Sequence, residues 1–176
     1  MPSGVYQRKV KPFRVENGYI VVSMSNGLET ILDIDFLWLV TSKSIYLKKH
    51  HSGDPYAFVW MENRDLQLHR VVTGIRDPKI IIDHKDRNKL NNLRSNLRIS
   101  TNSQNQFNSK RRNTASKYKG LTWTENTKRW RVYVTIPGHG TVHVGYFKSE
   151  IDAALAYNRE AAKHQGEFAL LNNVEY

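Results

Sequence analysis

The sequence predicts an α+β protein made of short strands with few helices. In the first half, short apolar runs alternate with turn-forming residues, as in residues 18–25 and 29–33 on either side of Asn26-Gly27, a strong two-residue hairpin signal. In the second half, three apolar runs precede one alanine-rich segment of helical length. Short strands together with a few helices indicate the α+β class.

Composition excludes several classes of protein. Of the 176 residues, 39% are hydrophobic and 4 are Trp, which is typical of a folded chain rather than a disordered basic tail. Cysteine is absent, so disulfides, thiolate nucleophiles and cysteine-ligated zinc modules are excluded. No apolar run approaches membrane-spanning length, and the polar start is not a secretory signal. We therefore expect a soluble, intracellular protein without a membrane partner.

The charge of the chain indicates a polyanionic partner. The formal net charge is +11 and the pI is about 9.9. Nucleic acid is the first candidate. An anionic membrane surface is the second, but no basic amphipathic helix with an apolar face supports it.

The region up to about residue 68 is predicted to be a β-rich scaffold. Besides the first hairpin, we expect a short helix over residues 34–39 and a second hairpin from residues 44–48 and 56–60. No residue pattern in this region indicates site chemistry.

Candidate site residues follow a short apolar strand over residues 79–83, whose end presents Asp83 and His84. After a polar loop, residues 96–100 can return as a strand. Thr101 then begins a capping box with a glutamine three residues on, which predicts a short helix carrying Asn105 in its first or second turn.

These side chains suit a one-metal nuclease site. The Asp83 carboxylate and the Asn105 amide oxygen are hard ligands for Mg²⁺, which would bind a scissile phosphate. His84 can take a proton from the attacking water, and Asn96 is placed to fix the loop that aims His84. Asp-His pairs also occur at strand ends with packing roles, and on these two residues alone that alternative stays open.

The run DHKDRNKLNNLRSNLRISTNSQN (residues 83–105) closely resembles the HNH endonucleases of the homing type carried by phages and introns. The pair His69-Arg70 also matches that family, and the resemblance covers about residues 31–108. It implies a ββα-metal fold and nicking or cutting of duplex DNA that depends on Mg²⁺ or Mn²⁺, without an organic cofactor. Carried over by position, His84 is the base, Asp83 and Asn105 hold the metal, and Asn96 orients the loop.

Three positions need comment against the family pattern. Arg87 stands where the family usually has glycine, so a positive φ in this turn would fall to Asn88 or cost strain. Asn105 replaces a histidine, a variant common in the homing branch. We expect His69 to be a packed, hydrogen-bonded residue rather than a metal ligand.

The C-terminal region is predicted to be a three-stranded antiparallel sheet with one helix. The strands span residues 119–124, 130–136 and 141–147, and the helix begins at the cap Ser149 and ends near Gly166. From Lys110 to Arg131 there are eight basic residues and one acidic residue, which we interpret as a phosphate-tracking surface rather than a solvated linker.

Residues 116–173, including SKYKGL, VGYF and EIDAALAYN, resemble the APETALA/ethylene-response-factor DNA-binding domain. That family lays its sheet in the major groove with the helix packed behind. Several groove positions that are arginine in the plant relatives are threonine in this chain, which implies weak sequence preference and a mainly anchoring role. The expected DNA-binding residues are Lys110, Arg111, Arg112, Lys117, Lys119, Thr122, Thr124, Arg129, Arg131, Tyr133, Thr135, Thr141 and His143.

We therefore expect an HNH endonuclease domain with its scaffold over residues 1–108, a basic linker over 109–116, and a DNA-binding domain over 117–176. The expected partner is double-stranded DNA in the cytoplasm of a bacterial or phage-infected cell, and monomer and dimer both stay open. The main alternative is a DNA-binding regulator with a non-catalytic HNH scaffold. An RNA-binding protein is a third, which no sequence cue supports.

Overall fold

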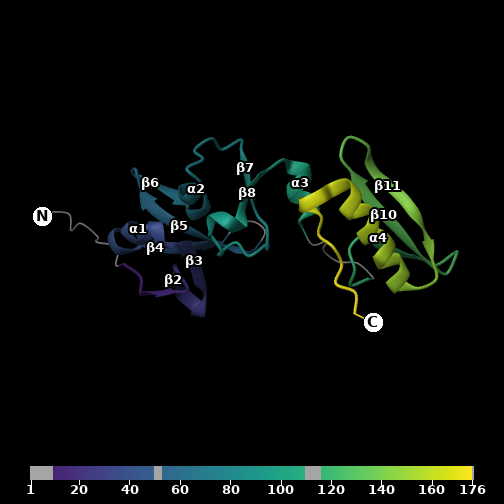
Figure 1. Cartoon of the computed structure of the whole chain (residues 1–176), viewed down its shortest axis with the longest axis horizontal. Helices are drawn as coiled ribbons and strands as arrows, with labels where there is room; N and C mark the ends of the chain where they lie inside the picture. Colours follow the sequence, from purple (N-terminus) through teal and green to yellow (C-terminus); the bar gives the residue numbers. More distant parts are fainter. Residues whose placement is uncertain (1–9, 50–52, 110–115, 176) are drawn as a thin grey trace, which may run out of the picture. The chain divides into compact units, whose positions relative to one another are not determined.

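The computed structural model describes residues 10–49, 53–109 and 116–175, and it contains both helices and sheets, as expected for an α+β protein (Figure 1). The chain divides into two compact units, Met1–Ile99 and Ser100–Tyr176. None of the helices in the described part of the chain has the length and apolarity needed to span a bilayer.

The first unit begins with a three-stranded antiparallel sheet formed by β1 (Phe13–Glu16), β2 (Tyr19–Ser23) and β3 (Glu29–Asp33). The two-residue turn is Asn17-Gly18, which joins β1 to β2 with both residues at positive φ. Asn26-Gly27 also has positive φ, but Ser23 pairs with Glu29, so the predicted two-residue hairpin is a five-residue loop containing the 3₁₀ turn η1 (Ser25–Gly27). Strand β1 was missed.

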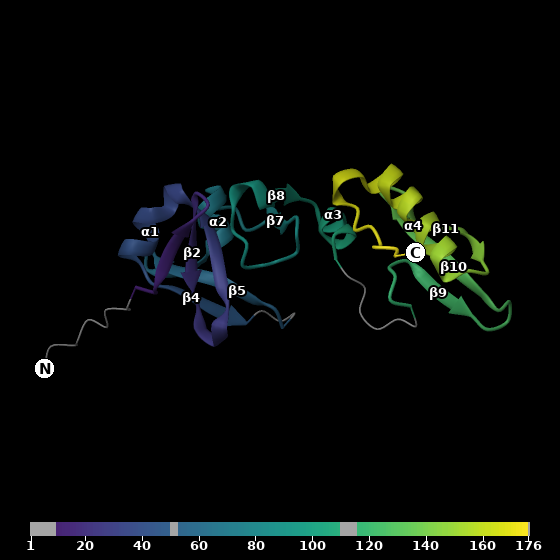
Figure 2. The same ribbon diagram turned by 60° about the horizontal axis from the view of Figure 1, so that its bottom comes forward.

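A second antiparallel sheet contains β4 (Ile45–Lys49), β5 (Pro55–Met61) and β6 (Arg64–Gln67). It is preceded by η2 (Ile34–Phe36) and α1 (Leu37–Ser42) and followed by α2 (Leu68–Thr73), which ends on Gly74 in the left-handed conformation. Figure 2 shows α1, α2 and the strands of this unit. Their apolar faces share one core, whose fully buried members include Ile20, Leu32, Leu39, Val59 and Leu68.

The remaining elements of the first unit are β7 (Ile81–His84), η3 (Arg94–Asn96) and β8 (Leu97–Ser100), whose last residue already lies in the second unit. β7 and β8 pair in a two-stranded sheet. The loop between them is attached to β3, because the backbone N–H of Ile31 donates to Leu90 O (3.0 Å) and the N–H of Asn92 donates to Ile31 O (2.9 Å).

The second unit contains α3 (Asn102–Phe107), then β9 (Leu121–Thr124), β10 (Arg129–Ile136) and β11 (Gly140–Phe147), then α4 (Glu150–Gln165) and η4 (Gly166–Phe168). The antiparallel sheet has the order β11-β10-β9 and α4 packs along it (Figure 2). The predicted C-terminal elements are thus present. The division into functional domains at residues 108 and 117 stays a prediction, since the compact units meet between residues 99 and 100.

The two faces of β10 follow the predicted alternation. Val132 and Val134 are buried in a core with Leu121, Ala153 and Tyr157, while the alternate residues of β10 point away from α4. Helix α4 begins at Ser149, whose hydroxyl accepts from the N–H of Asp152, and its alanines allow close packing on the sheet.

The closest approach in this core is at Gly120. An added Cβ would lie 2.1 Å from Tyr157 Cδ2 and 2.8 Å from the backbone oxygen of Tyr133. Gly120 also has a φ of +83°. Glycine is therefore required at this position both by packing and by backbone conformation.

We predict that Gly120→Ala lowers the free energy of unfolding by more than about 3 kcal/mol, because strain at positive φ adds to overpacking. The matched control is Gly138→Ala, at a φ of +76° with nothing within 4 Å of the added Cβ, which should cost about 1 kcal/mol. Urea unfolding of both variants is the measurement. Equal losses at the two glycines would contradict the proposed packing.

Candidate functional site

The end of β7 places two polar side chains deep inside the first unit. Asp83 is 1% exposed and His84 is 0% exposed, while Ile82 before them is buried in the apolar core. A carboxylate and an imidazole at this depth need compensating contacts, because burying polar groups without them is costly.

Arg98 supplies such a contact to Asp83. Its Nε and Nη2 donate to Asp83 Oδ2 at 3.1 and 2.9 Å, and its side chain is only 10% exposed. Arg98 lies on β8, so this buried ion pair links the two strands of the small sheet. Sequence reasoning missed Arg98, since the only signal was an arginine within a short strand predicted to follow the loop.

His84 contacts aromatic neighbours rather than solvent. Its ring centroid lies 5.3 Å from that of His69, with the planes nearly perpendicular, and 6.3 Å from that of Tyr56. Burial is the main cause that lowers the pKa of His84 to about 4; the charge of Lys89 acts in the same direction, and the hydrogen bond of Asn92 opposes it. His84 is therefore neutral, and able to accept a proton, at neutral pH.

His69 comes from α2 and is 6% exposed, a packed residue as predicted. Burial, together with the neighbouring His84, lowers its pKa to about 3. The adjacent Arg70 donates from Nη1 to Asp77 O and from Nη2 to Ile80 O, at 3.0 and 2.9 Å, so it fixes the segment that leads into β7.

Asn96 holds the loop after His84 at both ends. Its Oδ1 accepts from the N–H of Asp86 at 3.1 Å, and its Nδ2 donates to Asp86 Oδ1 at 2.9 Å and to Asn91 O at 2.8 Å. Asp86 also accepts from the N–H of Asn88 and the Nδ2 of Asn91. These bonds are what a loop-orienting role requires of Asn96, and Asp86 is its main partner in the network.

The β-rich scaffold reaches the site through Thr30 on β3. Thr30 is fully buried, and its hydroxyl donates to Leu90 O at 2.8 Å and accepts from Asn92 Nδ2 at 2.9 Å. Asn92 in turn raises the pKa of His84 by a hydrogen bond. The first sheet thus positions a side chain beside the candidate base, a connection without any sequence signal.

Arg87 itself adopts the positive φ that the turn requires. Its φ is 66°, and its N–H donates to His84 O at 2.9 Å. Of the two alternatives left by the sequence, the positive φ therefore falls to Arg87 and not to Asn88. A non-glycine residue in this region costs on the order of 1–2 kcal/mol.

Asn105 lies in α3, whose capping box is confirmed. The Thr101 hydroxyl accepts from Gln104 N–H at 3.2 Å, and Gln104 Oε1 accepts from Thr101 N–H at 2.8 Å. Asn105 is half-buried and belongs to the second compact unit, whereas Asp83, His84 and Asn96 belong to the first. Its role as the second metal ligand stays a prediction.

Comparison with known proteins identifies a family and relatives of this chain. The model of a family described as HNH endonuclease matches residues 67–107. An HNH endonuclease of Acanthamoeba polyphaga mimivirus is 31% identical over 165 residues, which is 90% of this chain and 82% of the viral protein. The chain belongs to the HNH endonuclease family. It is accordingly a nuclease that cleaves DNA.

A second relative of this HNH endonuclease is Protein 3.8 of Escherichia phage T7, which is 34% identical over 76 residues, 43% of this chain and 63% of the phage protein. No solved structure matches the chain closely enough to count as a relative.

Two side chains of this HNH endonuclease carry the type of oxygen ligand that a hard divalent ion binds. Asp83 offers a carboxylate and Asn105 an amide oxygen, the ligand types that Mg²⁺ and Mn²⁺ prefer. Across the described residues, no three or more His, Asp or Glu side chains gather as a metal-binding group. Arg98 on Asp83 Oδ2 shows that the carboxylate is oriented and charge-compensated in the protein alone.

The predicted DNA-binding residues of the sheet share one face. Registers of β10 with β9 and β11 place Arg129 opposite Thr124, Tyr133 opposite His143 and Thr135 opposite Thr141. Thr122 and Arg131 form a further pair on this face, and Lys117 is exposed before β9. Lys110, Arg111 and Arg112 lie outside the described residues.

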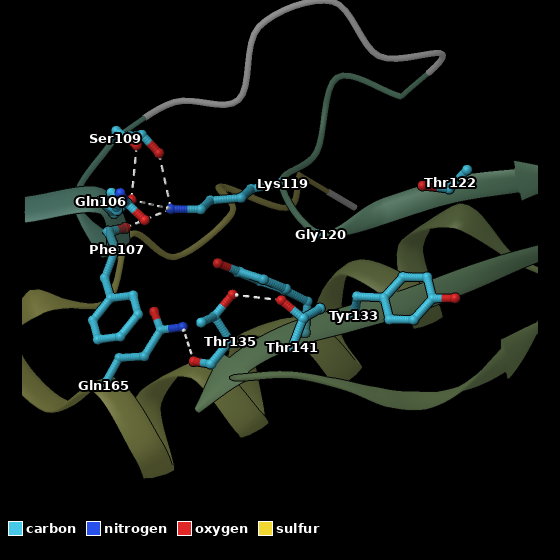
Figure 3. Close-up of a pocket in the computed structure, with 11 residues that line it drawn as sticks. Gln106, Phe107, Ser109, Lys119, Gly120, Thr122, Tyr133, Thr135, Thr141 and Gln165 are labelled. Atoms are coloured by element: carbon cyan, nitrogen blue, oxygen red, sulfur yellow. Dashed lines mark hydrogen bonds between the residues drawn. The ribbon is translucent and has the colours of Figure 1, made fainter. Parts of the chain in front are cut away.

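A cavity of about 590 Å³ opens beside this face and lies wholly within the second unit (Figure 3). Its wall includes Thr135, Thr141 and Tyr133 from the sheet, Phe107 from α3 and Gln165 from α4. The Lys119 ammonium at its edge donates to the backbone oxygens of three residues at the C-terminal end of α3, Gln106, Phe107 and Ser109. Lys119 therefore caps this helix end, a favourable place for a cation.

The two buried histidines predict a pH-dependent stability. Below the ordinary pKa of 6.5 the unfolded imidazoles bind protons, whereas the folded ones stay neutral down to about 4 for His84 and about 3 for His69. The unfolded state then holds more protons, so stability falls as the pH falls through 6.5. For metal-free protein we expect the free energy of unfolding to drop by about 2–4 kcal/mol from about pH 7.5 to pH 5.

Urea unfolding at both pH values measures this loss, and His69→Leu should make it clearly smaller. His139→Leu, in an exposed turn, is the control and should leave the loss unchanged. The same loss in His69→Leu as in the natural chain would contradict the assignment.

Proposed function

We propose that this HNH endonuclease is of the homing type and nicks or cuts double-stranded DNA by metal-dependent hydrolysis of a phosphodiester bond. The observation that carries the proposal is the neutral, fully buried imidazole of His84 directly after the Asp83 carboxylate at the end of β7. The family match over residues 67–107 supports it.

In this proposal His84 is the general base. Held neutral by burial, it accepts a proton from the water that attacks the phosphorus, a contribution of roughly 10²–10⁴-fold to the rate. The perpendicular contact with His69 fixes the orientation of its ring. Asn96 orients the following loop through its three hydrogen bonds, so the backbone of His84 is restrained on the C-terminal side as well.

Asp83 and Asn105 are the residues proposed to hold Mg²⁺ or Mn²⁺. When bound, the ion supplies charge that polarises the phosphate and stabilises the departing oxygen. Arg98 orients the Asp83 carboxylate through two hydrogen bonds from its guanidinium. The ββα-metal arrangement of β7, β8 and α3 is part of the same proposal.

The C-terminal sheet is proposed to anchor the nuclease on DNA, as in the APETALA/ethylene-response-factor domains it resembles. Supporting this, the described sheet has three antiparallel strands with one helix behind it, and its other face carries arginines and threonines. The net charge of +11 favours phosphate contacts, each of which contributes a salt slope of about −0.9 on duplex DNA.

The test is nicking of supercoiled plasmid with Mg²⁺ or Mn²⁺. We expect conversion to nicked or linear plasmid, its loss with excess chelator, and a rate about 10²–10⁴-fold lower for His84→Ala. His164→Ala, near the C-terminal end of α4, is the control and should cut at the natural rate. Circular dichroism confirms that each variant is folded.

Two outcomes would contradict the proposal. Unaltered nicking by a folded His84→Ala variant would overturn His84 as the base. Intact plasmid with the natural chain over a range of salt and metal concentrations would instead favour the regulator with a non-catalytic HNH scaffold.

A further inference from the structure

Four side chains form one continuous cluster on the face of the sheet that points away from α4. The His143 ring lies 5.5 Å from Tyr133 and 4.8 Å from Tyr146 between centroids. The Arg131 guanidinium lies over Tyr133 at 4.5 Å and over Tyr146 at 5.9 Å. We refer to Arg131, Tyr133, His143 and Tyr146 as the aromatic cluster.

A β-bulge brings Tyr146 into this cluster. Tyr133 on β10 pairs with His143 on β11, whereas Val132, the residue before it, pairs with Gly145. Val144 is therefore an extra residue in β11. Strict alternation from His143 would place Gly145 on this face. The inserted residue places Tyr146 there instead, opposite Arg131.

The cluster is accessible and positively charged. Tyr146 is 42% exposed and His143 is also exposed, although large aromatic side chains are usually buried. Tyr146 is thus an apolar surface beside a guanidinium in a chain of net charge +11. This combination suits a partner that has both flat apolar rings and negative charge, which is the chemistry of nucleotides.

The same face is poorly equipped to read duplex guanines. The Arg131 guanidinium lies over Tyr133, and its Nε is buried without a hydrogen-bond partner among the described residues. Its partner on β9 is Thr122, and its partner on β11 is Tyr146, and neither side chain has a bidentate fork. Flat rings offer more to the faces of unstacked bases, which a duplex does not expose.

The cavity beside the cluster offers space for such a base. Tyr133 belongs to both, at the end of the cavity opposite Phe107 and Gln165 (Figure 3). Its volume of about 590 Å³ is within the usual range for small-ligand sites. Tyr157 Oη and Gln165 Oε1 are buried in its wall without hydrogen-bond partners among the described residues.

We propose that this face of the second unit binds unpaired DNA, with bases stacked on the aromatic cluster and one base entering the adjoining cavity. The inference rests on the proposed function in that the unpaired strand is taken to be part of the DNA on which the nuclease acts. It goes beyond that function by adding unpaired DNA to the duplex that this sheet is proposed to contact.

The experiment uses the full chain with chelator, so that no cutting occurs. The probes are a labelled oligothymidylate of about 20 nucleotides and its duplex with oligoadenylate, a length that covers one small binding module. Fluorescence anisotropy measures both affinities. The variants are Tyr146→Ala and Tyr146→Phe, with Val142→Ala as the control, a residue of similar exposure on the same strand.

We expect Tyr146→Ala to weaken binding of the single strand by about 5- to 100-fold, the effect of losing one stacked base, and to change duplex binding little. Tyr146→Phe keeps the ring and should bind like the natural chain, as should Val142→Ala. Equal loss on both probes, no loss on either, or no binding of the single strand would overturn the inference.

These results separate the inference from the nuclease proposal. If plasmid is cut normally but Tyr146→Ala binds the single strand as tightly as the natural chain, the inference fails and the nuclease proposal stands. If the single-strand loss appears but plasmid stays intact, the inference stands and the nuclease proposal fails.

Discussion

The buried ion pair between Asp83 and Arg98 is the constraint on which the rest of the site depends. A carboxylate that is 1% exposed is tolerated only beside a compensating charge, and removing one partner of such a pair typically costs about 3–5 kcal/mol. Because the two residues lie on β7 and β8, the pair ties the strands on either side of the loop. It therefore determines where His84 can lie and how the loop begins.

Further hydrogen bonds hold the loop after His84 and connect it to the β-rich scaffold. Asn96 is the last residue of η3, directly before β8, so the amide that bonds both ends of the loop lies two residues before Arg98. On the other side of the site, Thr30 on β3 holds Asn92 beside His84. The imidazole is thus held from two directions, and its burial keeps it neutral, although the hydrogen bond of Asn92 acts in the opposite direction. The strained φ of Arg87 persists because these contacts fix the turn around it.

Sequence predicted those parts whose determinants are local. The capping box of Thr101, the cap at Ser149 and the alternation of β10 depend on residues a few positions apart, and all three are present. The residues at the end of β7 could be chosen because their chemistry is specific. The structure shows that both are buried, and their catalytic and metal-binding roles stay a prediction. The role of Arg98, the contact of His69 with His84 and the contribution of Thr30 could not be predicted, because each depends on packing between distant segments.

The position of Tyr146 on the face away from α4 could not be predicted for a different reason. A bulge shifts the alternation of β11 by one residue, and no turn-forming residue marks it.

We propose that Asp83 and Asn105 are both ligands of one divalent ion, with His84 as the base. The most direct measurement is an anomalous-scattering map of crystals grown with Mn²⁺ and a short duplex. We expect one strong peak whose ligands include the Asp83 carboxylate and the Asn105 amide oxygen, which are donor types that suit a hard divalent cation. A peak bound by other residues, or Asp83 still paired with Arg98 and no ion beside it, would contradict the account.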